Sequence, residues 1–202
     1  MTFQTSKAVL LDAGGHTRVV CGGIEGEVIG CLGPVLPDAR WPQEIPWLGG
    51  DDALEGLDPE DVLVLNGVAD TARRIMLFDL VTAKGFALAT VVPRLAGILD
   101  RVEILEDAQI MAGALVQCDS RIGRNALINT GAIVEHDCVV EDDAHVAPGA
   151  ILCGNVTVGA QAHVGAGATV IQGVRIGSGG GGDRRLAVER HRGRRSVAAG
   201  GS

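Results

Sequence analysis

The most regular pattern in the chain is an aliphatic residue at every sixth position of its second half. The series runs without exception from Ile98 to Ile176, and the residue two places before each member is small or is Val. Helices repeat near 3.6 residues and plain strands near 2, so neither produces a strict period of six. A parallel β-helix does, because each of its three sides sends one aliphatic side chain inward and residues eighteen apart stack in columns.

Stacking is what makes such a repeat stable. Each buried aliphatic side chain contributes roughly 1.5–3 kcal/mol, but a single coil cannot bury its own inner face. We therefore expect residues 93–178 to form a left-handed parallel β-helix. Cys138 occupies one of the small-residue positions, so we expect packing rather than chemistry to explain it.

The first 92 residues have a different pattern, in which short apolar runs alternate with a helical one. The sequence predicts a helix at Thr71–Gly85, and strands at Lys7–Leu11, Val28–Leu32, Val62–Leu65 and Phe86–Val92. A glycine turn at Asp12–His16 links the first strand to a helix start. This alternation predicts a small α/β, Rossmann-like domain with a parallel sheet over residues 1–92.

The period of six ends before the last segment, residues 179–202. Its next position is Gly182, and the tail holds six Arg against one Asp and one Glu. Its Gly- and Arg-rich composition is typical of a disordered segment. Since solenoids normally need a capping element, two explanations stay open: a flexible basic tail, or a segment translated from a shifted reading frame or left by cloning.

Composition argues against a nucleic-acid-binding or membrane-inserted protein. A net charge of −8 gives no support to a nucleic-acid partner. No run reaches 18 apolar residues and no signal peptide opens the sequence, so we expect no membrane insertion. The five cysteines are odd in number and irregularly spaced, which favours reduced thiols and a cytoplasmic location.

Two histidines and several carboxylates gather inside the repeat, where turn residues alone would suffice. The motifs are N-T-G-A-I-V-E-H-D-C at 129–138, H-V-A-P-G-A at 145–150 and C-G-N-V at 153–156, preceded by the G-G-H turn at 14–16. In this order, over about residues 7–178, the chain resembles the hexapeptide-repeat acetyltransferases. More narrowly, it resembles the family of sialic acid O-acetyltransferases and amino-sugar-nucleotide N-acetyltransferases.

That resemblance implies a homotrimer with acetyl-CoA in the cleft between neighbouring coils. It implies His136 as general base, with Asp137 and Asn129 orienting its ring, and the backbone N–H of Gly154 as oxyanion donor. The repeat supports this pairing independently, because Gly154 follows His136 by eighteen positions. The two residues should then lie one coil apart, at about 4.8 Å.

The resemblance also implies binding residues. For the acceptor they are Gly14, Gly15, His16, Gly67 and His145; for acetyl-CoA they are Gly154, His145 and Gly165. A strand-to-helix turn suits an anionic sugar nucleotide. However, Asp12 replaces the first glycine of the family turn, and Leu32-Gly33-Pro34 stands where the family often has an acidic pair. A purely conformational role for the glycine turn stays open.

The expected activity is acetyl transfer to an amino-sugar nucleotide or a sialic-acid-type sugar in cell-surface polysaccharide biosynthesis, with no metal and no acyl-enzyme. N- and O-acetylation are both open, as are a different acyl donor or acceptor and an inactive trimeric scaffold. A zinc-dependent γ-class carbonic anhydrase would need two histidines separated by four residues, which the sequence lacks. His136 or His145 as an ordinary surface residue is the simpler alternative for each.

Overall fold

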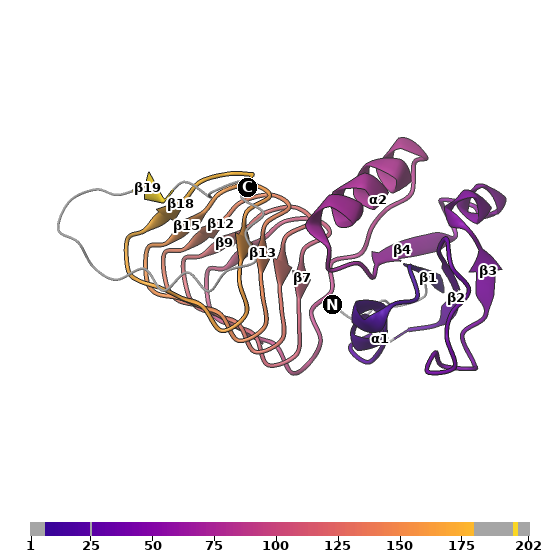
Figure 1. Ribbon diagram of the computed structural model, residues 1–202, viewed down its shortest axis with the longest axis horizontal. Helices are drawn as coiled ribbons and strands as arrows, with labels where there is room; N and C mark the ends of the chain where they lie inside the picture. The colour runs from indigo at the N-terminus through magenta and orange to yellow at the C-terminus, as the bar shows by residue number, and fades with distance from the viewer. Residues whose placement is uncertain (1–6, 25, 180–195, 198–202) are drawn as a thin grey trace. The chain divides into compact units, whose positions relative to one another are not determined.

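A computed structural model describes residues 7–24, 26–179 and 196–197. The chain divides into two compact units, which meet in the sequence between Val91 and Val92. The first unit combines a small sheet with helices, and the second is a stack of short strands wound into coils (Figure 1).

The first unit is built on four parallel strands in the order β3-β2-β1-β4. The strands are β1 (Lys7–Leu11), β2 (Val28–Leu32), β3 (Trp47–Gly49) and β4 (Val62–Asn66). The helical elements are α1 (Gly15–Cys21), the 3₁₀ helix η1 (Asp51–Gly56) and α2 (Thr71–Ala83). The predicted parallel α/β fold of this unit is confirmed.

Both faces of this sheet are covered. Along β1, Val9 and Leu11 alternate with Leu10, and all three side chains are buried. Leu77 and Val81 of α2 pack into the same apolar cluster as Val9 and Leu11. Near-continuous apolar strands of this kind are typical of parallel sheets whose two faces are both covered.

Two parts of this unit differ from the sequence prediction. The predicted strand Phe86–Val92 is wrong, because the segment contains only isolated bridge residues, Leu88 and Val91, of which Leu88 pairs with Val64 of β4. The chain then leaves the edge toward Pro93, which has no N–H to continue a ladder. The edge strand β3 was not predicted, since its three residues follow a segment rich in proline.

The second unit has three parallel sheets, one on each side of the coil (Figure 1). One side holds β7 (Gln109–Ile110), β10 (Leu127–Ile128), β13 (His145–Val146) and β16 (His163–Val164). The next holds β5 (Gly97–Ile98), β8 (Leu115–Val116), β11 (Ile133–Val134), β14 (Ile151–Leu152) and β17 (Thr169–Val170). The third holds β6 (Glu103–Ile104), β9 (Arg121–Ile122), β12 (Val139–Val140), β15 (Thr157–Val158), β18 (Arg175–Ile176) and β19 (Ser196–Val197).

Strands in adjacent coils pair with an offset of eighteen residues, as Leu127 does with His145. The aliphatic residue of each strand points inward, and from Ile110 to Val170 every member of the series is fully buried. These side chains and the small residues before them form one continuous apolar cluster. The left-handed parallel β-helix predicted from the period of six is confirmed.

The corners of the coil show a second period of six that the aliphatic series does not reveal. Every sixth residue from Arg101 to Gly179 has a positive φ, between 50° and 74°. L-residues avoid this conformation, and Gly, Asn and Asp tolerate it best. Glycine fills one corner throughout (Gly113, Gly131, Gly149, Gly167), whereas Asp and Asn predominate at the other two. The corner composition is therefore set by backbone conformation.

The tail mostly lies outside the described residues, so its predicted disorder or shifted frame stays a prediction. The described pair of residues in β19 extends the third sheet by pairing with β18, Ser196 opposite Arg175. This pairing is offset by twenty-one residues rather than eighteen.

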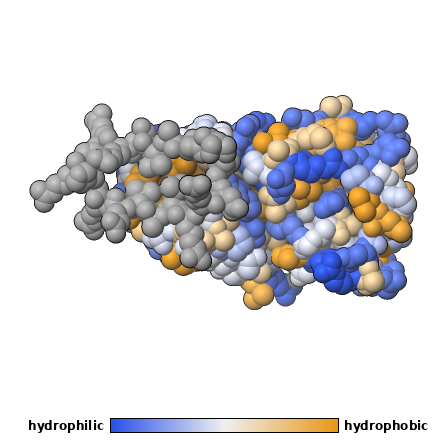
Figure 2. All heavy atoms as spheres, in the orientation of Figure 1, coloured by the Kyte–Doolittle hydropathy of each residue, from blue (hydrophilic) through white to orange (hydrophobic). Residues whose placement is uncertain are grey.

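No helix among the described residues is long and apolar enough to cross a membrane. On the face drawn in Figure 2, apolar side chains are interspersed with hydrophilic ones. The most exposed large apolar residues include Val35, Leu36 and Leu95.

Asp107 gives a prediction about the stability of the coil. Burial, together with the nearby charge of Glu106, raises the pKa of this corner carboxyl to about 7. The unfolded value lies near 4, so the folded state favours the protonated form, and stability is lost as pH rises from about 4 through 7. We expect Asp107→Asn to be more stable than the wild type by about 1–3 kcal/mol at pH 8, but not at pH 4.

Urea unfolding followed by circular dichroism at both pH values measures this difference. Asp119→Asn is the matched control, because Asp119 also occupies a corner with positive φ. Its pKa is lowered by the hydrogen bond from Arg101, so this variant should lose stability at pH 8. Equal stability of Asp107→Asn and the wild type at pH 8 would contradict the prediction.

Candidate active site

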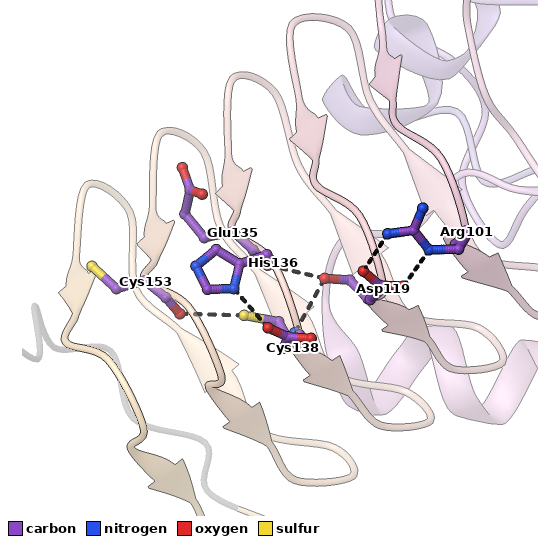
Figure 3. Close-up of polar contacts among 8 residues, drawn as sticks. Arg101, Asp119, Glu135, His136, Cys138 and Cys153 are labelled. Atoms are coloured by element: carbon purple, nitrogen blue, oxygen red, sulfur yellow. Dashed lines mark hydrogen bonds and ion pairs between the residues drawn. The ribbon is translucent and has the colours of Figure 1, made fainter.

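His136 and Asp137 form the corner that follows β11. The positive φ of Asp137, 59°, ends one side of the coil and turns both side chains outward. Asp137 Oδ2 lies 2.7 Å from His136 Nδ1 (Figure 3). The His136 side chain is half exposed, at 51%. The corner therefore presents an imidazole that is fixed at one nitrogen and open to solvent.

The hydrogen bond that His136 donates to Asp137 decides which ring nitrogen carries the proton. A carboxylate only accepts hydrogen bonds, so Nδ1 of His136 carries the proton and Nε2 of the neutral ring has a free lone pair. The same bond raises the pKa of His136, with smaller contributions from the charges of Asp137, Glu135 and Asp119. The imidazole is therefore a stronger base than an ordinary histidine.

Gly154 lies directly against the ring of His136, one coil further along. Asn155 N–H donates to the His136 carbonyl at 2.9 Å, which joins the two coils at this corner. A Cβ on Gly154 would lie 2.6 Å from Cε1 and 2.7 Å from Nε2 of the imidazole. Any side chain at residue 154 would therefore displace the ring.

A second group of candidate residues lies in the sheet that contains β13, or directly after its strands. Asn129 and His145 are both buried, and Asn129 Nδ2 lies 3.1 Å from His145 Nε2. The rings of His145 and His163 meet edge to face, with centroids 4.5 Å apart. Gly165 follows β16 in the same column as Asn129. The predicted residues Asn129, His145 and Gly165 thus belong together.

Within one chain Asn129 lies apart from His136, so its predicted role in orienting that ring stays a prediction. Its Nδ2 contacts His145, and its Oδ1 accepts from Thr130 N–H at 2.8 Å. The reason is topological: the side of the coil formed by β11 separates residue 129 from residue 136. The candidate residues of the coil therefore form two groups, His136–Asp137–Gly154 and Asn129–His145–Gly165.

In the glycine turn after β1, the side chain of Asp12 binds a backbone N–H of the same turn. Asp12 has a positive φ of 71°, and its Oδ2 accepts a hydrogen bond from Gly14 N–H at 3.2 Å. This N–H is one that an anion at the turn would use. Gly14, Gly15 and His16 do lie at the start of α1 as expected, but their role in acceptor binding stays a prediction.

Gly67 has a packing explanation. A Cβ there would lie 2.5 Å from Thr17 Oγ1 and 2.6 Å from the Leu11 carbonyl oxygen. Thr17 Oγ1 also donates to the Gly67 carbonyl at 3.0 Å. This close approach ties α1 to the end of β4 and requires glycine, whereas contact with an acceptor stays a prediction.

No three His, Cys, Asp or Glu side chains gather as a metal site within the described part of the chain. The five cysteines are all free thiols; they are Cys21, Cys31, Cys118, Cys138 and Cys153.

Comparison with known proteins places these residues in a family. A family model for bacterial transferase hexapeptide (six repeats) matches residues 119–154 and 137–172. A histidine-to-asparagine variant of perosamine N-acetyltransferase from Caulobacter crescentus, in complex with CoA and GDP-perosamine, has 32% sequence identity and a TM-score of 0.76; the match covers 87% of this chain and 84% of that one. The chain belongs to the hexapeptide-repeat sugar acetyltransferases.

Two further structures resemble this acetyltransferase. The acetyltransferase domain of PglB from Neisseria gonorrhoeae, in complex with acetyl coenzyme A, has 29% identity and a TM-score of 0.80, with 87% of each chain covered. WeeI from Acinetobacter baumannii, at 22% identity and a TM-score of 0.74, covers 87% of this chain and 90% of its own and supports the fold alone. No curated protein matches the sequence.

Sequence reasoning missed a charged pair beneath the His136 corner of this acetyltransferase. Asp119 lies one coil below Asp137, and Arg101 binds it through two hydrogen bonds of 2.7 and 2.8 Å (Figure 3). Asp119 adds to the field that raises the pKa of His136, and Arg101 offsets part of its charge. The signal was available, because Asp119 precedes Asp137 by eighteen residues.

Proposed function

We propose that this acetyltransferase moves the acetyl group of acetyl-CoA to the amino group of a nucleotide-linked sugar. The observation that carries the proposal is the imidazole of His136, hydrogen-bonded by Asp137 and packed on Gly154. The PglB domain in complex with acetyl coenzyme A and the perosamine enzyme in complex with GDP-perosamine support the choice of donor and acceptor. We place the reaction in cytoplasmic steps of cell-surface glycan biosynthesis.

In this mechanism Nε2 of His136 is the general base. The acceptor nitrogen attacks the thioester carbonyl carbon while the imidazole takes its proton. Asp137 holds Nδ1–H and stabilises the imidazolium that forms. The thioester oxygen becomes an oxyanion, and Gly154 N–H donates to it. When the C–O double bond reforms, the C–S bond breaks and the His136 imidazolium returns its proton to the sulfur. CoA leaves as the thiol and His136 is neutral again, so no acyl-enzyme forms.

We further propose that the working unit is a homotrimer whose sites combine residues from two chains. The support is the separation of the two groups, since one side of the coil lies between His136 and the Asn129–His145 pair. A site that uses both groups therefore needs a second coil. The half-exposed face of His136 is open to such a neighbour.

Complementation between variants tests this arrangement. His136→Gln and His145→Ala should each be nearly inactive as pure proteins. Co-expressed, they should form mixed trimers in which one interface joins an intact His136 to an intact His145, and part of the wild-type activity should return. Light scattering reports the oligomer, and the absence of recovery from proven mixed trimers would contradict a shared site.

The function itself is tested by incubating the purified chain with acetyl-CoA and a panel of GDP- and UDP-linked amino sugars. We expect one acceptor class to gain an acetyl group, seen by mass spectrometry, with stoichiometric release of CoA. Sialic acid and a nucleotide sugar without an amino group separate O- from N-acetylation. Acetylation of hydroxyl groups alone would contradict the proposed amino acceptor and show that the enzyme is an O-acetyltransferase.

Calorimetry separates the enzyme from an inactive scaffold. An intact donor site should release heat on titration with acetyl-CoA. The specific reason to test this is that the period of six stops after Ile176, where β19 pairs at a different offset. Absence of heat at millimolar acetyl-CoA, with no acetyl transfer to any acceptor, would favour the scaffold.

The pH dependence of kcat/KM gives a prediction for Asp137. His136 must be neutral to take a proton, so activity falls as pH drops through its pKa. Because the hydrogen bond to Asp137 raises that pKa, the acid limb of the wild-type pH profile should lie above the ordinary histidine value near 6.5. Asp137→Asn should shift the limb to lower pH and reduce the plateau rate.

Asp119→Asn is the control for this shift. It removes a charge that acts on His136 only at a distance, so its limb should move less than that of Asp137→Asn. An acid limb of Asp137→Asn that coincides with the wild type would show that Asp137 does not set the basicity of His136.

A further inference from the structure

One column inside the coil contains two side chains that differ from the rest of the small-residue series. The small residues that precede the strands are Ala or Val, except for Ser120 and Cys138. These two residues are eighteen apart, lie in adjacent coils and are fully buried, with exposures of 1% and 0%. A hydroxyl and a thiol therefore replace apolar groups only beneath the corners that carry His136 and Gly154.

Ser120 bonds to both ends of the His136 corner. Its hydroxyl donates to the Glu135 carbonyl at 2.9 Å and accepts from Cys138 N–H at 3.1 Å. These two backbone groups bracket His136 and Asp137, so the hydroxyl closes their turn from inside the coil. A buried hydroxyl with both roles satisfied holds the backbone in one geometry.

Cys138 makes the equivalent contact one coil further along. Its thiol donates to the Cys153 carbonyl at 3.3 Å (Figure 3). That carbonyl and the N–H of Gly154 belong to one planar trans peptide, in which they point in opposite directions. Because the carbonyl faces Cys138 inside the coil, the N–H of Gly154 faces outward. The Cα of Gly154 is the atom that lies against the His136 ring.

We propose that Ser120 and Cys138 are positioning residues for acetyl transfer. From inside the coil, Ser120 fixes the turn that carries the general base, and Cys138 fixes the peptide that supplies the oxyanion donor. This inference rests on the proposed function and extends it, since neither side chain touches substrate. It also explains why the hydrogen-bonding groups occur at these two positions of an otherwise apolar column.

The two roles predict different kinetic effects. Removal of the Cys138 thiol leaves the His136 turn unchanged but frees the 153–154 peptide to rotate. Cys138→Ala should therefore lower kcat about tenfold, with the KM for acetyl-CoA within about twofold and the acid limb of the pH profile unmoved. Cys138→Ser should restore most of the rate, because its hydroxyl donates to the same carbonyl.

Removal of the Ser120 hydroxyl acts on the base instead. Ser120→Ala loosens the turn that holds His136 against Asp137, so kcat should fall about tenfold and the acid limb should shift to lower pH. Ser120→Cys should recover part of the lost kcat and part of the shift of the acid limb. Val102→Ala, in the same column one coil below, is the control: it removes packing without these hydrogen bonds, and should lower Tm while kcat stays unchanged.

An NMR titration of His136 gives a readout independent of turnover. We expect its pKa to fall in Ser120→Ala and to stay at the wild-type value in Cys138→Ala. In an active enzyme, unchanged kcat and titration in both alanine variants, or losses matched by Val102→Ala, would overturn the positioning roles and leave the proposed function intact. A wild type with no acetyl transfer would overturn the proposed function itself, and the positioning role with it.

Discussion

Replacement of His136 by glutamine is expected to lower kcat by about 10²–10⁴ while the coil remains folded. Glutamine keeps a side chain of similar length that can still hydrogen-bond to Asp137, but it cannot take a proton from the acceptor. The side chain is half exposed and outside the apolar cluster of the coil. The fall in rate should therefore appear without a fall in Tm, which circular dichroism measures on the same samples.

Glu106→Gln is the matched control for this variant. Glu106 precedes a corner residue of positive φ, as His136 does, but at a different corner of the coil. Its replacement should leave kcat at the wild-type value. A His136→Gln enzyme with wild-type turnover would exclude the imidazole as base, and transfer would then have to rely on the deprotonated acceptor alone.

The shape of the second unit follows from the sequence because its cause is local and repeated. Each aliphatic residue from Ile110 to Val170 is buried at the place the period of six assigns to it. The first unit was harder to predict where packing decides the structure. Phe86–Val92 has the composition of a strand, yet it contains only isolated bridge residues, of which Leu88 pairs with Val64.

The candidate site was likewise predictable in part. Counting by eighteen places Gly154 next to His136, and the close approach of the imidazole shows why residue 154 is glycine. Counting says nothing about hydrogen-bond partners, so the contact between the Asn129 amide and His145 was not predicted. The interior bond from Cys138 to the Cys153 carbonyl was also missed, because a small apolar position explains a cysteine equally well.

In the proposed mechanism the chemistry takes place at the corners of the coil, while the inner columns set its geometry. The αL corner residue Asp137 aims the imidazole, and the coil ladder brings Asn155 N–H to the His136 carbonyl. The distance between the proposed base and the proposed oxyanion donor is then set by the spacing of strands in a sheet, about 4.8 Å. Loss of the stack should therefore abolish the site even where every corner residue is retained.

Val146→Asp is the variant expected to destroy the stack. Val146 is fully buried in the middle of the coil, among inward-facing aliphatic residues of the coils on either side. An aspartate there would be an unpaired charge without polar partners, which should cost more than about 4 kcal/mol. We expect insoluble protein, or a soluble chain that loses its β-type circular dichroism and all acetyl transfer.

Two variants make this result specific. Thr169→Asp adds the same charge at an exposed, outward-facing strand position of the coil and should keep the wild-type Tm. Val146→Ala removes two methyl groups without adding charge and should lower stability by about 1–3 kcal/mol, within the range of urea unfolding. A soluble Val146→Asp protein with unchanged melting would mean that this column does not point inward. The proposed base and oxyanion donor would then lose the common scaffold on which their alignment depends.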